Sequence, residues 1–329
     1  MTTAAKRGSL MRKPTILALA FSVLVATPGL SLAADLVIGV PNWSSAAVTA
    51  HVLKTVLEQE FDASVELEEG TDAEIFARMD AGTAHIHPEV WLPNHSALST
   101  EYVVKRKTVE MSPKGVTARQ GICVTRHTRD HFGVKSVADL TDPRKAAIFD
   151  TVGDGRGEIW IGAPSWSSTR IERIRAEGYG FAATMKLLEA EETIATAAID
   201  AAVAVDKPLV FYCYQPHHVF ELHDIVYLEE PPYDPRNWSI VDSVESDWQA
   251  KSKAVGAWPV SSFHIHYSVK LAEQRPDIAA FLAAIQLDVD TVTQMTYSVV
   301  VERRHPSEFA AQWVSDNRER ISAWRDAAK

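Results

Sequence analysis

The chain has 329 residues and a formal net charge of −10 at pH 7. An acidic chain has no electrostatic reason to bind nucleic acid or an anionic membrane surface, so we exclude both as partners. The length is enough for two domains.

The first 33 residues have the pattern of a cleaved signal peptide. A basic start is followed by an apolar stretch from Pro14 to Ala26 and then by Ser31-Leu32-Ala33, which fits the small-x-small rule for cleavage. The apolar stretch is short for a membrane span. We therefore predict residues 1–33 to be a signal peptide and the mature protein to be periplasmic and not membrane-embedded. The alternative is a cytoplasmic protein with an apolar N-terminus.

After residue 34 the chain alternates strand patterns with helix patterns. Thr71 and Glu74 form a capping box, and Gly82 suits the end of the helix that they begin. The predicted elements are a strand at Asp35–Val40, a helix capped by Ser44 or Ser45, a strand at Ser64–Leu67, a helix at Thr71–Gly82 and a strand at Ala84–Trp91.

The alternation resumes further along the chain. Strands that alternate with helices predict an α/β fold with a largely parallel sheet. Two lobes joined at a hinge are the simplest arrangement, with a ligand between them at the carboxyl ends of strands. The predicted elements are strands at Gly121–Thr125, Pro208–Tyr214 and Asp224–Tyr227, helices at Ser136–Leu140, Thr169–Gly178 and Met185–Ala204, and helices after Pro276, which suits a helix N1 position.

Cys123 and Cys213 are the only cysteines. Both lie in strand patterns, and an oxidising compartment allows them to pair. The sequence does not give their geometry, so a disulfide and two free thiols both stay open.

Several of the nine tryptophans lie where a predicted strand meets a loop. Trp43, Trp91 and Trp166 have this position, and Tyr212 and Tyr214 end another strand. Such positions line the cleft of an α/β fold. Aromatic faces attract a cation that has no hydrogen-bond donors, as in quaternary ammonium compounds. Core packing is the alternative for any single tryptophan.

Much of the mature chain resembles the glycine betaine, choline and proline-betaine binding proteins of ABC importers. The resemblance implies an α/β, two-lobed periplasmic binding protein with a hinge (type II-like) and a ligand between the lobes. Lobe 1 is expected at residues 34–118 plus 260–329, and lobe 2 at residues 119–259. The matching segments are Val90–His95, Phe149–Trp166, Lys207–Pro216, Pro259–His264 and Leu271–Leu287.

The resemblance also implies an aromatic cage around a methylated ammonium group. Its members here are Trp91, Trp166 and Tyr214, and Trp43 resembles an additional aromatic residue of choline-type relatives. We call these four residues the aromatic cage. Around the Tyr214 strand some relatives have tryptophans, which this chain lacks.

Polar groups distinguish the candidate ligands. By family position, the backbone N–H groups of Ser167 and Ser168 are candidate donors to a ligand carboxylate. Glu89 lies two residues before Trp91, so in a strand both side chains point to the same face. A buried glutamate near the cage attracts a cation and repels a carboxylate. This favours choline or trimethylamine N-oxide over glycine betaine, although Glu89 as a hinge or surface residue is an alternative.

Asp150, Asp154 and Glu158 resemble the start of an EF-hand calcium loop, with Gly155 at its sixth position. The motif is incomplete, so the prediction is at most a structural calcium ion. A tight turn held by aspartate hydrogen bonds is the alternative. We expect no other cofactor.

Two other functions are weighed against solute binding. The chain has no nucleophile elbow, phosphate-binding glycine loop or zinc-protease motif, so we predict that it is not an enzyme. A zinc-binding transport protein is the other alternative. We expect a monomer whose partners are a methylated amine and an ABC importer permease. The histidines that suggest zinc are His85, His87, His95, His217, His218, His264 and His266.

Overall fold

The computed structural model describes residues 1–5, 34–241 and 246–328. The predicted signal peptide lies almost entirely outside the described residues, and it stays a prediction. Residues 34–329 form one compact unit. Within the described ranges, no helix is both long and apolar enough to cross a membrane.

Ten strands of this unit form one mixed sheet in the order β2-β1-β3-β12-β5-β8-β6-β7, with β4 beside β12 and β9 beside β5. Pairing is parallel at the two outer parts and antiparallel in the middle, where β12 and β5 lie. The prediction of a largely parallel sheet is wrong for the middle, because β12 returns there from the C-terminal part of the chain. The bounds are β1 (Leu36–Val40), β2 (Val65–Glu69), β3 (Ile86–Leu92), β4 (Val109–Met111), β5 (Val116–Thr125), β6 (Gly157–Trp160), β7 (Met185–Leu188), β8 (Val210–Gln215), β9 (Ile225–Tyr227) and β12 (Ser261–Ser268), with a separate pair β10 (Trp238–Ser239) and β11 (Lys253–Ala254).

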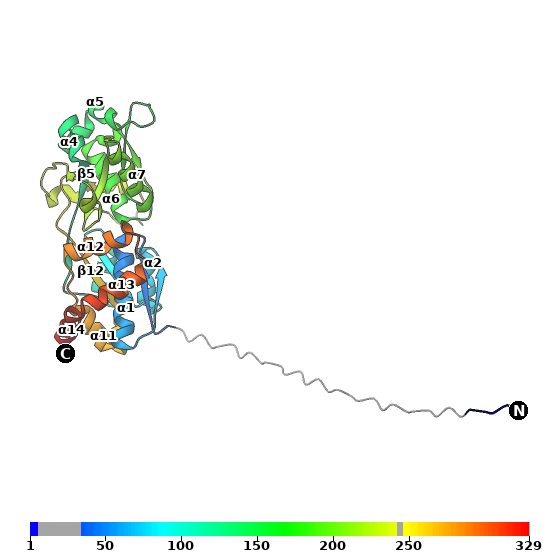
Figure 1. Ribbon diagram of the computed structural model, residues 1–329. Coiled ribbons are helices and arrows are strands. Elements are labelled where there is room, and N and C mark those ends of the chain that lie inside the picture. Colours follow the sequence, from blue (N-terminus) through cyan, green and yellow to red (C-terminus); the bar gives the residue numbers. More distant parts are fainter. Residues whose placement is uncertain (6–33, 242–245, 329) are drawn as a thin grey trace. The chain divides into compact units, whose positions relative to one another are not determined.

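Helices cover both parts of the sheet (Figure 1). The longer helices are α1 (Ser44–Phe61), α2 (Asp72–Ala81), α6 (Ser167–Tyr179), α7 (Glu192–Ala204), α11 (Pro276–Ala284), α12 (Val289–Val300), α13 (Pro306–Asp316) and α14 (Arg318–Ala327). The shorter helical segments are α3 (Ser96–Ser99), η1 (Thr100–Lys105), α4 (Arg126–Phe132), η2 (Val137–Thr141), α5 (Pro143–Ala146), η3 (Ala147–Phe149), η4 (Phe181–Ala183), α8 (Val219–Leu222), η5 (Pro235–Asn237), α9 (Trp248–Lys251) and α10 (Val269–Gln274).

Strand β5 belongs to both parts of the sheet. Its residues up to Ala118 pair with β12, and its residues from Arg119 onward pair with β8. Ser261, at the start of β12, lies opposite Ala118. Figure 1 shows α4 to α7 around one part and α1, α2 and α11 to α14 around the other. The fold is therefore two-lobed α/β, as expected. This switch of β5 from pairing with β12 to pairing with β8 supports lobe boundaries near residues 118 and 260. These boundaries remain a proposal.

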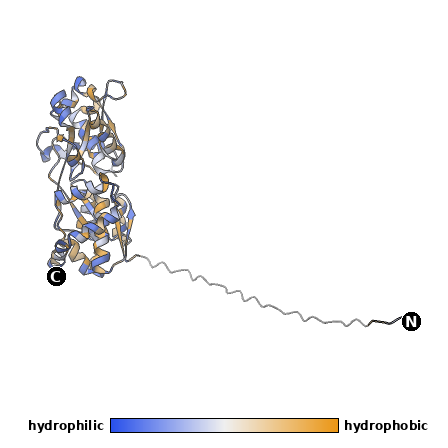
Figure 2. Cartoon of the chain, in the orientation of Figure 1, coloured by the Kyte–Doolittle hydropathy of each residue, from blue (hydrophilic) through white to orange (hydrophobic). Residues whose placement is uncertain are grey.

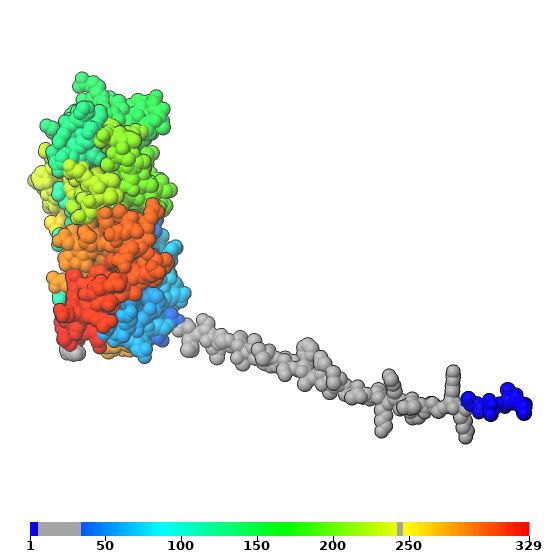
Figure 3. Space-filling view, viewed as in Figure 1, coloured from blue at the N-terminus to red at the C-terminus, as the bar shows by residue number. Residues whose placement is uncertain are grey.

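Each lobe has its own hydrophobic core. In lobe 1, α1 and the C-terminal helices bury residues such as Val52, Phe281 and Trp324. Figure 3 shows the C-terminal segment (red) lying against the segment that follows residue 34 (lighter blue). In lobe 2, residues such as Ile122 and Phe181 form the core. Hydrophobic segments occur through both lobes and hydrophilic ones alternate with them (Figure 2), as amphipathic elements require.

Local sequence signals explain several element ends. Thr71 and Glu74 form the predicted capping box of α2, and Gly82 ends that helix with φ 75°. Pro276 begins α11, as predicted. The predicted helix over Met185–Ala204 is wrong in its first part, because Met185–Leu188 pairs with β6 as a strand and the helix starts only at Glu192.

The structure joins Cys123 and Cys213 in a disulfide. The two residues lie on the paired strands β5 and β8, two register positions apart. The bond connects positions 90 residues apart in the sequence and so ties together the middle of lobe 2.

Candidate ligand-binding site

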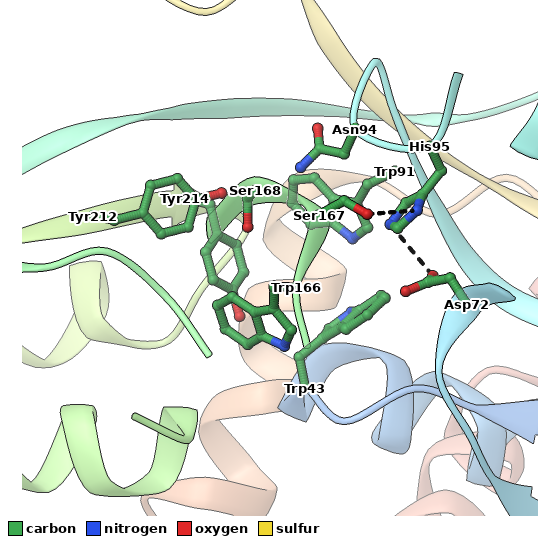
Figure 4. Close-up of a pocket in the computed structure, with 10 residues that line it drawn as sticks. All are labelled: Trp43, Asp72, Trp91, Asn94, His95, Trp166, Ser167, Ser168, Tyr212 and Tyr214. Atoms are coloured by element: carbon green, nitrogen blue, oxygen red, sulfur yellow. Dashed lines mark hydrogen bonds and ion pairs between the residues drawn. The ribbon is translucent and has the colours of Figure 1, made fainter. Parts of the chain in front are cut away.

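A small cavity lies beside strands of both parts of the sheet (Figure 4). Its size suits a small ligand. Each lobe contributes five of the lining residues. They are Trp43, Asp72, Trp91, Asn94 and His95 from lobe 1, and Trp166, Ser167, Ser168, Tyr212 and Tyr214 from lobe 2.

The four residues of the aromatic cage all line this cavity. Their rings meet nearly at right angles: Trp43 and Trp166 at 88°, Trp91 and Tyr214 at 83°, and Trp166 and Tyr214 at 78°. The corresponding centroid distances are 6.4, 5.3 and 5.9 Å. Rings in this arrangement enclose a space on several sides, as Figure 4 shows. All four side chains are at most 8% exposed.

Two of the three cage indoles and the Tyr214 hydroxyl donate to groups outside the lining. Trp43 Nε1 donates to Glu89 at 3.0 Å, and Trp166 Nε1 donates to Asn42 Oδ1 at 3.1 Å. Tyr214 donates its hydroxyl to Glu192. Because these donors are satisfied, the cavity walls are mainly ring faces, which suit a guest without hydrogen-bonding groups at that end.

Glu89 lies behind the cage and is not among the lining residues. Its side chain is completely buried. It accepts hydrogen bonds from Trp43 Nε1, Ser45 Oγ at 2.7 Å and Thr49 Oγ1 at 2.9 Å. Burial raises the pKa of the Glu89 carboxyl, and these hydrogen bonds oppose the shift. The predicted direct contact between Glu89 and a ligand therefore has no support from this geometry.

The opposite side of the cavity is polar. His95 joins Asp72 and Ser167, with Nε2 3.3 Å from Asp72 Oδ1 and Nδ1 3.3 Å from Ser167 Oγ (Figure 4). His87 lies 3.0 Å from the same Asp72 oxygen. Burial alone would raise the pKa of Asp72, but His95 and His87 lower it below its ordinary value. Burial lowers the pKa of His95 against the opposing charge of Asp72. A carboxylate and an imidazole thus face the space next to the rings.

Sequence reasoning missed Asp72, Asn94 and His95 as lining residues. Asp72 is the first residue of α2, and its sequence position resembles an ordinary helix start. Asn94 and His95 follow Trp91 closely, so their nearness to a cage residue was the available signal.

Ser167 and Ser168 begin α6 at the cavity wall. The residue before them, Trp166, makes no side-chain cap. The first N–H groups of a helix have no partner within the helix and favour a negative charge nearby. This end of the cavity can therefore receive an acceptor oxygen.

Contacts near the cage connect α1 of lobe 1 with α7 of lobe 2. The N–H of Ser44 donates to Glu192 at 2.8 Å, and Asn42 donates to Glu191 at 2.9 Å. Burial would raise the pKa of Glu192. The hydrogen bond and charge of His217, together with hydrogen bonds from Tyr214 and the Ser44 backbone, lower the pKa to about 2. The prediction that Ser44 or Ser45 caps α1 is wrong. Trp43 takes the cap position, and the Glu192 carboxylate satisfies the first N–H.

Of the predicted calcium residues, Asp150 and Asp154 lie in a turn and Glu158 lies on β6. Asp150 accepts backbone hydrogen bonds from Val152, Gly153 and Gly155. Asp154 pairs with Lys186, and the third predicted ligand, Glu158, accepts from the backbone of residue 151. This is the hydrogen bonding of a tight turn.

No described residues form a group of three or more His, Cys, Asp or Glu side chains that could hold a metal ion. Several histidines of the zinc alternative have other contacts. His87 and His95 contact Asp72, and His217 contacts Glu192. Burial lowers the pKa of His218 and His266 to about 3.

The two-lobed α/β fold, with a cavity lined equally by both lobes, defines a solute-binding protein. Residues 34–316 match the family model of the substrate-binding domain of ABC-type glycine betaine transport systems, and the chain belongs to this family. Members of the family are substrate-binding components of transporters, so the chain is not an enzyme. Substrate binding in this family needs no cofactor.

Curated relatives are similar along much of their length. The glycine betaine/proline betaine-binding periplasmic protein of Escherichia coli is 23% identical over 97% of this chain and 98% of the relative. The protein of the same name from Salmonella typhimurium is 22% identical over 63% of each chain, so that alignment spans just under two thirds of the relative.

Solved structures show the same fold. A lactococcal OpuAC in its closed conformation with glycine betaine has a TM-score of 0.66 at 19% identity, covering 88% of this chain and 98% of that one. An ABC-transporter choline-binding protein with choline has a TM-score of 0.68 at 14% identity, covering 88% and 90%.

Proposed function

We propose that the protein is the periplasmic solute-binding component of an ABC importer and binds a small methylated ammonium compound in the aromatic cage. The observation that carries this proposal is the set of four buried aromatic side chains around one cavity, with three pairs of rings nearly perpendicular. Cation–π attraction by several such faces is how proteins recognise quaternary ammonium groups. The periplasmic relatives support the location.

Choline and trimethylamine N-oxide are the favoured ligands. The Asp72 carboxylate faces the cavity, and its pKa is lowered by its histidine partners despite burial. It attracts a cation and repels a ligand carboxylate. The hydroxyl of choline has Asp72 and His95 as acceptors, and the N-oxide oxygen has Ser167 and Ser168 as donors.

Glycine betaine is the third candidate. The first N–H groups of α6, at Ser167 and Ser168, suit a carboxylate, and relatives are named for glycine betaine binding. Asp72 on the same polar side opposes this ligand. The ratio of the affinities for choline and glycine betaine therefore tells whether Asp72 or the N–H groups of Ser167 and Ser168 determine the choice of ligand.

Closure of the two lobes around the ligand completes the proposal. Residues 34–118 plus 260–329 would form one lobe and residues 119–259 the other, with the hinge at the partner change of β5. The ligand would be released to a permease, and the carrier would act as a monomer.

Titration calorimetry with choline, trimethylamine N-oxide, glycine betaine, carnitine and zinc tests this function. Trp91→Ala and Trp166→Ala should each weaken binding of the preferred methylated amine by about ten-fold or more. Trp313→Ala is the matched control, because Trp313 packs on the distant core of lobe 1 and should leave affinity unchanged. Unchanged affinity in both cage variants would exclude the cage, and binding of zinc alone would favour a metal carrier.

Calcium at the Asp150 loop remains a separate proposal. Its support is the acidic spacing of Asp150, Asp154 and Glu158, whereas the hydrogen bonds of Asp150 favour a turn that needs no ion. A bound ion stabilises the folded state. A melting temperature that responds to neither calcium nor a chelator would remove calcium from the account.

A further inference from the structure

We propose that Gln120 is a positioning residue that favours the closed form of the protein. It joins cavity residues of both lobes at the point where the chain crosses between the lobes. We call Gln120 and its partners Asn94, Tyr212 and Ser261 the hinge clasp. The inference rests on the proposed function, in which the lobes close around a solute. Gln120 lies outside the cavity lining and acts through Asn94 and Tyr212, which line it.

Gln120 lies just beyond the boundary between the lobes on β5. Ala118 pairs with Ser261 of β12, whereas Gln120 pairs with Tyr214 of β8. The side chain of Gln120 is only 5% exposed. The residue is therefore buried at the place where β5 leaves lobe 1 and enters lobe 2, which the proposed function assigns as the hinge.

The side-chain amide of Gln120 makes four hydrogen bonds. Its oxygen Oε1 accepts from Asn94 Nδ2 at 2.8 Å and from the Tyr212 hydroxyl at 2.7 Å. Its nitrogen Nε2 donates to Asn94 Oδ1 at 2.9 Å and to Ser261 Oγ at 2.8 Å. A side-chain amide has two N–H donors and an oxygen with two lone pairs. The hydrogen-bonding capacity of Gln120 is therefore filled.

A backbone carbonyl fixes which way round this amide lies. Ser261 Oγ donates its proton to the carbonyl oxygen of Pro259 at 3.1 Å, so the Ser261 oxygen can only accept from Gln120. The amide nitrogen of Gln120 must then face Ser261, and the amide oxygen must face Tyr212. The Tyr212 hydroxyl thus donates its single proton to Gln120, and the direction of each bond in the hinge clasp is determined.

The hinge clasp connects the two lobes beside the ligand cavity. By the proposed boundaries Asn94 and Ser261 belong to lobe 1, whereas Gln120 and Tyr212 belong to lobe 2. Both bonds to Asn94 and the bond to Ser261 therefore cross from one lobe to the other. Asn94 and Tyr212 line the same cavity (Figure 4). Separation of the lobes would pull on the crossing bonds and open the cavity together.

Loss of the hinge clasp should affect the closed and open forms unequally. In the closed form Tyr212 is 2% exposed, so its hydroxyl would have little access to water if Gln120 could not accept from it. Water could replace Gln120 as the partner of Asn94 and Tyr212 once the lobes separate. A buried polar group without a partner costs more free energy than a hydrogen bond gains. Replacement of Gln120 by an apolar side chain should therefore favour the open form.

The kinetic test uses Gln120→Met, which keeps the length of the side chain and removes its amide. The ligand is whichever of choline, trimethylamine N-oxide and glycine betaine calorimetry shows to bind most tightly. Stopped-flow tryptophan fluorescence should show dissociation about ten-fold faster, with association almost unchanged. Thr184→Val is the matched control. Thr184 Oγ1 donates to the carbonyl oxygen of Leu140 at 2.6 Å within lobe 2, so its loss should lower stability without changing dissociation.

A double-mutant cycle separates the hinge clasp from a merely structural role. Ser261→Ala removes one partner of Gln120 and leaves the cavity lining intact. This milder change should speed dissociation several-fold. The double variant should release ligand no faster than Gln120→Met alone, because residues of one network are not independent. An unchanged dissociation rate in Ser261→Ala, or additive effects of the two changes, would overturn the inference.

Small-angle X-ray scattering of the ligand-free protein tests the hinge clasp without any ligand. Gln120→Met should have a larger radius of gyration than the unaltered protein, whereas Thr184→Val should not. Equal radii of Gln120→Met and the unaltered protein would overturn the inference. If the unaltered protein binds no methylated ammonium compound but Gln120→Met is more open, the proposed ligand fails and the hinge clasp stands.

Discussion

At the scale of single residues, the polar atoms of the cage are fixed by partners around the cavity. Glu89 holds Trp43, Asn42 holds Trp166 and Glu192 holds Tyr214. A ring whose polar atom is fixed keeps one orientation, so little side-chain freedom is lost when the lobes enclose a ligand.

Asp72 gives the first prediction. Asp72→Asn removes the one carboxylate that lines the cavity in the described part of the chain. Choline affinity should fall about ten-fold, and glycine betaine should gain relative to choline because a repulsive charge is gone. Calorimetry with the two ligands measures this ratio. A ratio equal to that of the unaltered protein would show that Asp72 does not select the ligand.

The sequence allowed prediction of the four rings and of Ser167 and Ser168, but not of Asp72 and His95. Trp43, Trp91 and Trp166 lie where strands or helices begin or end, and such positions gather at one cleft. Asp72 and His95 come together only through the packing of α2 against the end of β3. The sequence pattern contains no periodicity that signals this contact. The same limit applies to Glu89, because its spacing from Trp91 suggested a shared face but not a place behind Trp43.

At the scale of elements, β5 is the strand on which both lobes depend. It pairs with β12 in lobe 1 and with β8 in lobe 2. The apolar run at Gly121–Thr125 predicted only the second half of this strand. Its first half alternates buried and exposed residues, and its pairing with β12 depends on a distant segment of the chain, which local pattern does not encode.

The disulfide gives the second prediction. Replacing Cys123 and Cys213 by Ser should lower the free energy of unfolding by about 2–4 kcal/mol, because the bond closes a long loop of the unfolded chain. Ligand affinity should stay the same, since neither cysteine lines the cavity. Urea unfolding of the double variant and of the unaltered protein measures the difference. Equal stability would mean that the bond does not form in the native protein.

At the scale of the whole molecule, Glu192 connects the lobes beside the cage. Its carboxylate accepts from the N–H of Ser44 in lobe 1 and from Tyr214 in lobe 2. The Glu192 carboxylate holds both the ring of Tyr214 and the start of α1. Closure of the lobes and enclosure of a ligand by the cage should therefore occur together. Closure around ligands is a common use of such contacts.

Acid gives the third prediction. The folded pKa of Glu192 is about 2 and its ordinary value is 4.5. A lowered pKa contributes stability above pH 4.5, and that stability is lost as the pH falls toward 2. The melting temperature of the unaltered protein should therefore decline across this interval more steeply than that of Glu192→Gln. Parallel declines would show that Glu192 is not stabilised as a carboxylate.

Glu192→Gln also gives a fourth prediction at neutral pH. The amide accepts fewer and weaker hydrogen bonds from Ser44 and Tyr214, so closure should weaken and ligand affinity should fall several-fold. Glu191→Gln is the matched control. Glu191 is exposed, and among the residues that hold the cage rings it contacts only Asn42. A larger effect at Glu191 than at Glu192 would contradict the assigned connection.

A crystal structure with choline bound tests the central claim most directly. The account predicts the methylated nitrogen within about 6 Å of the ring centroids of Trp43, Trp91, Trp166 and Tyr214, with the hydroxyl toward Asp72 and His95. Choline bound elsewhere, or a cage left empty at saturating choline, would contradict it.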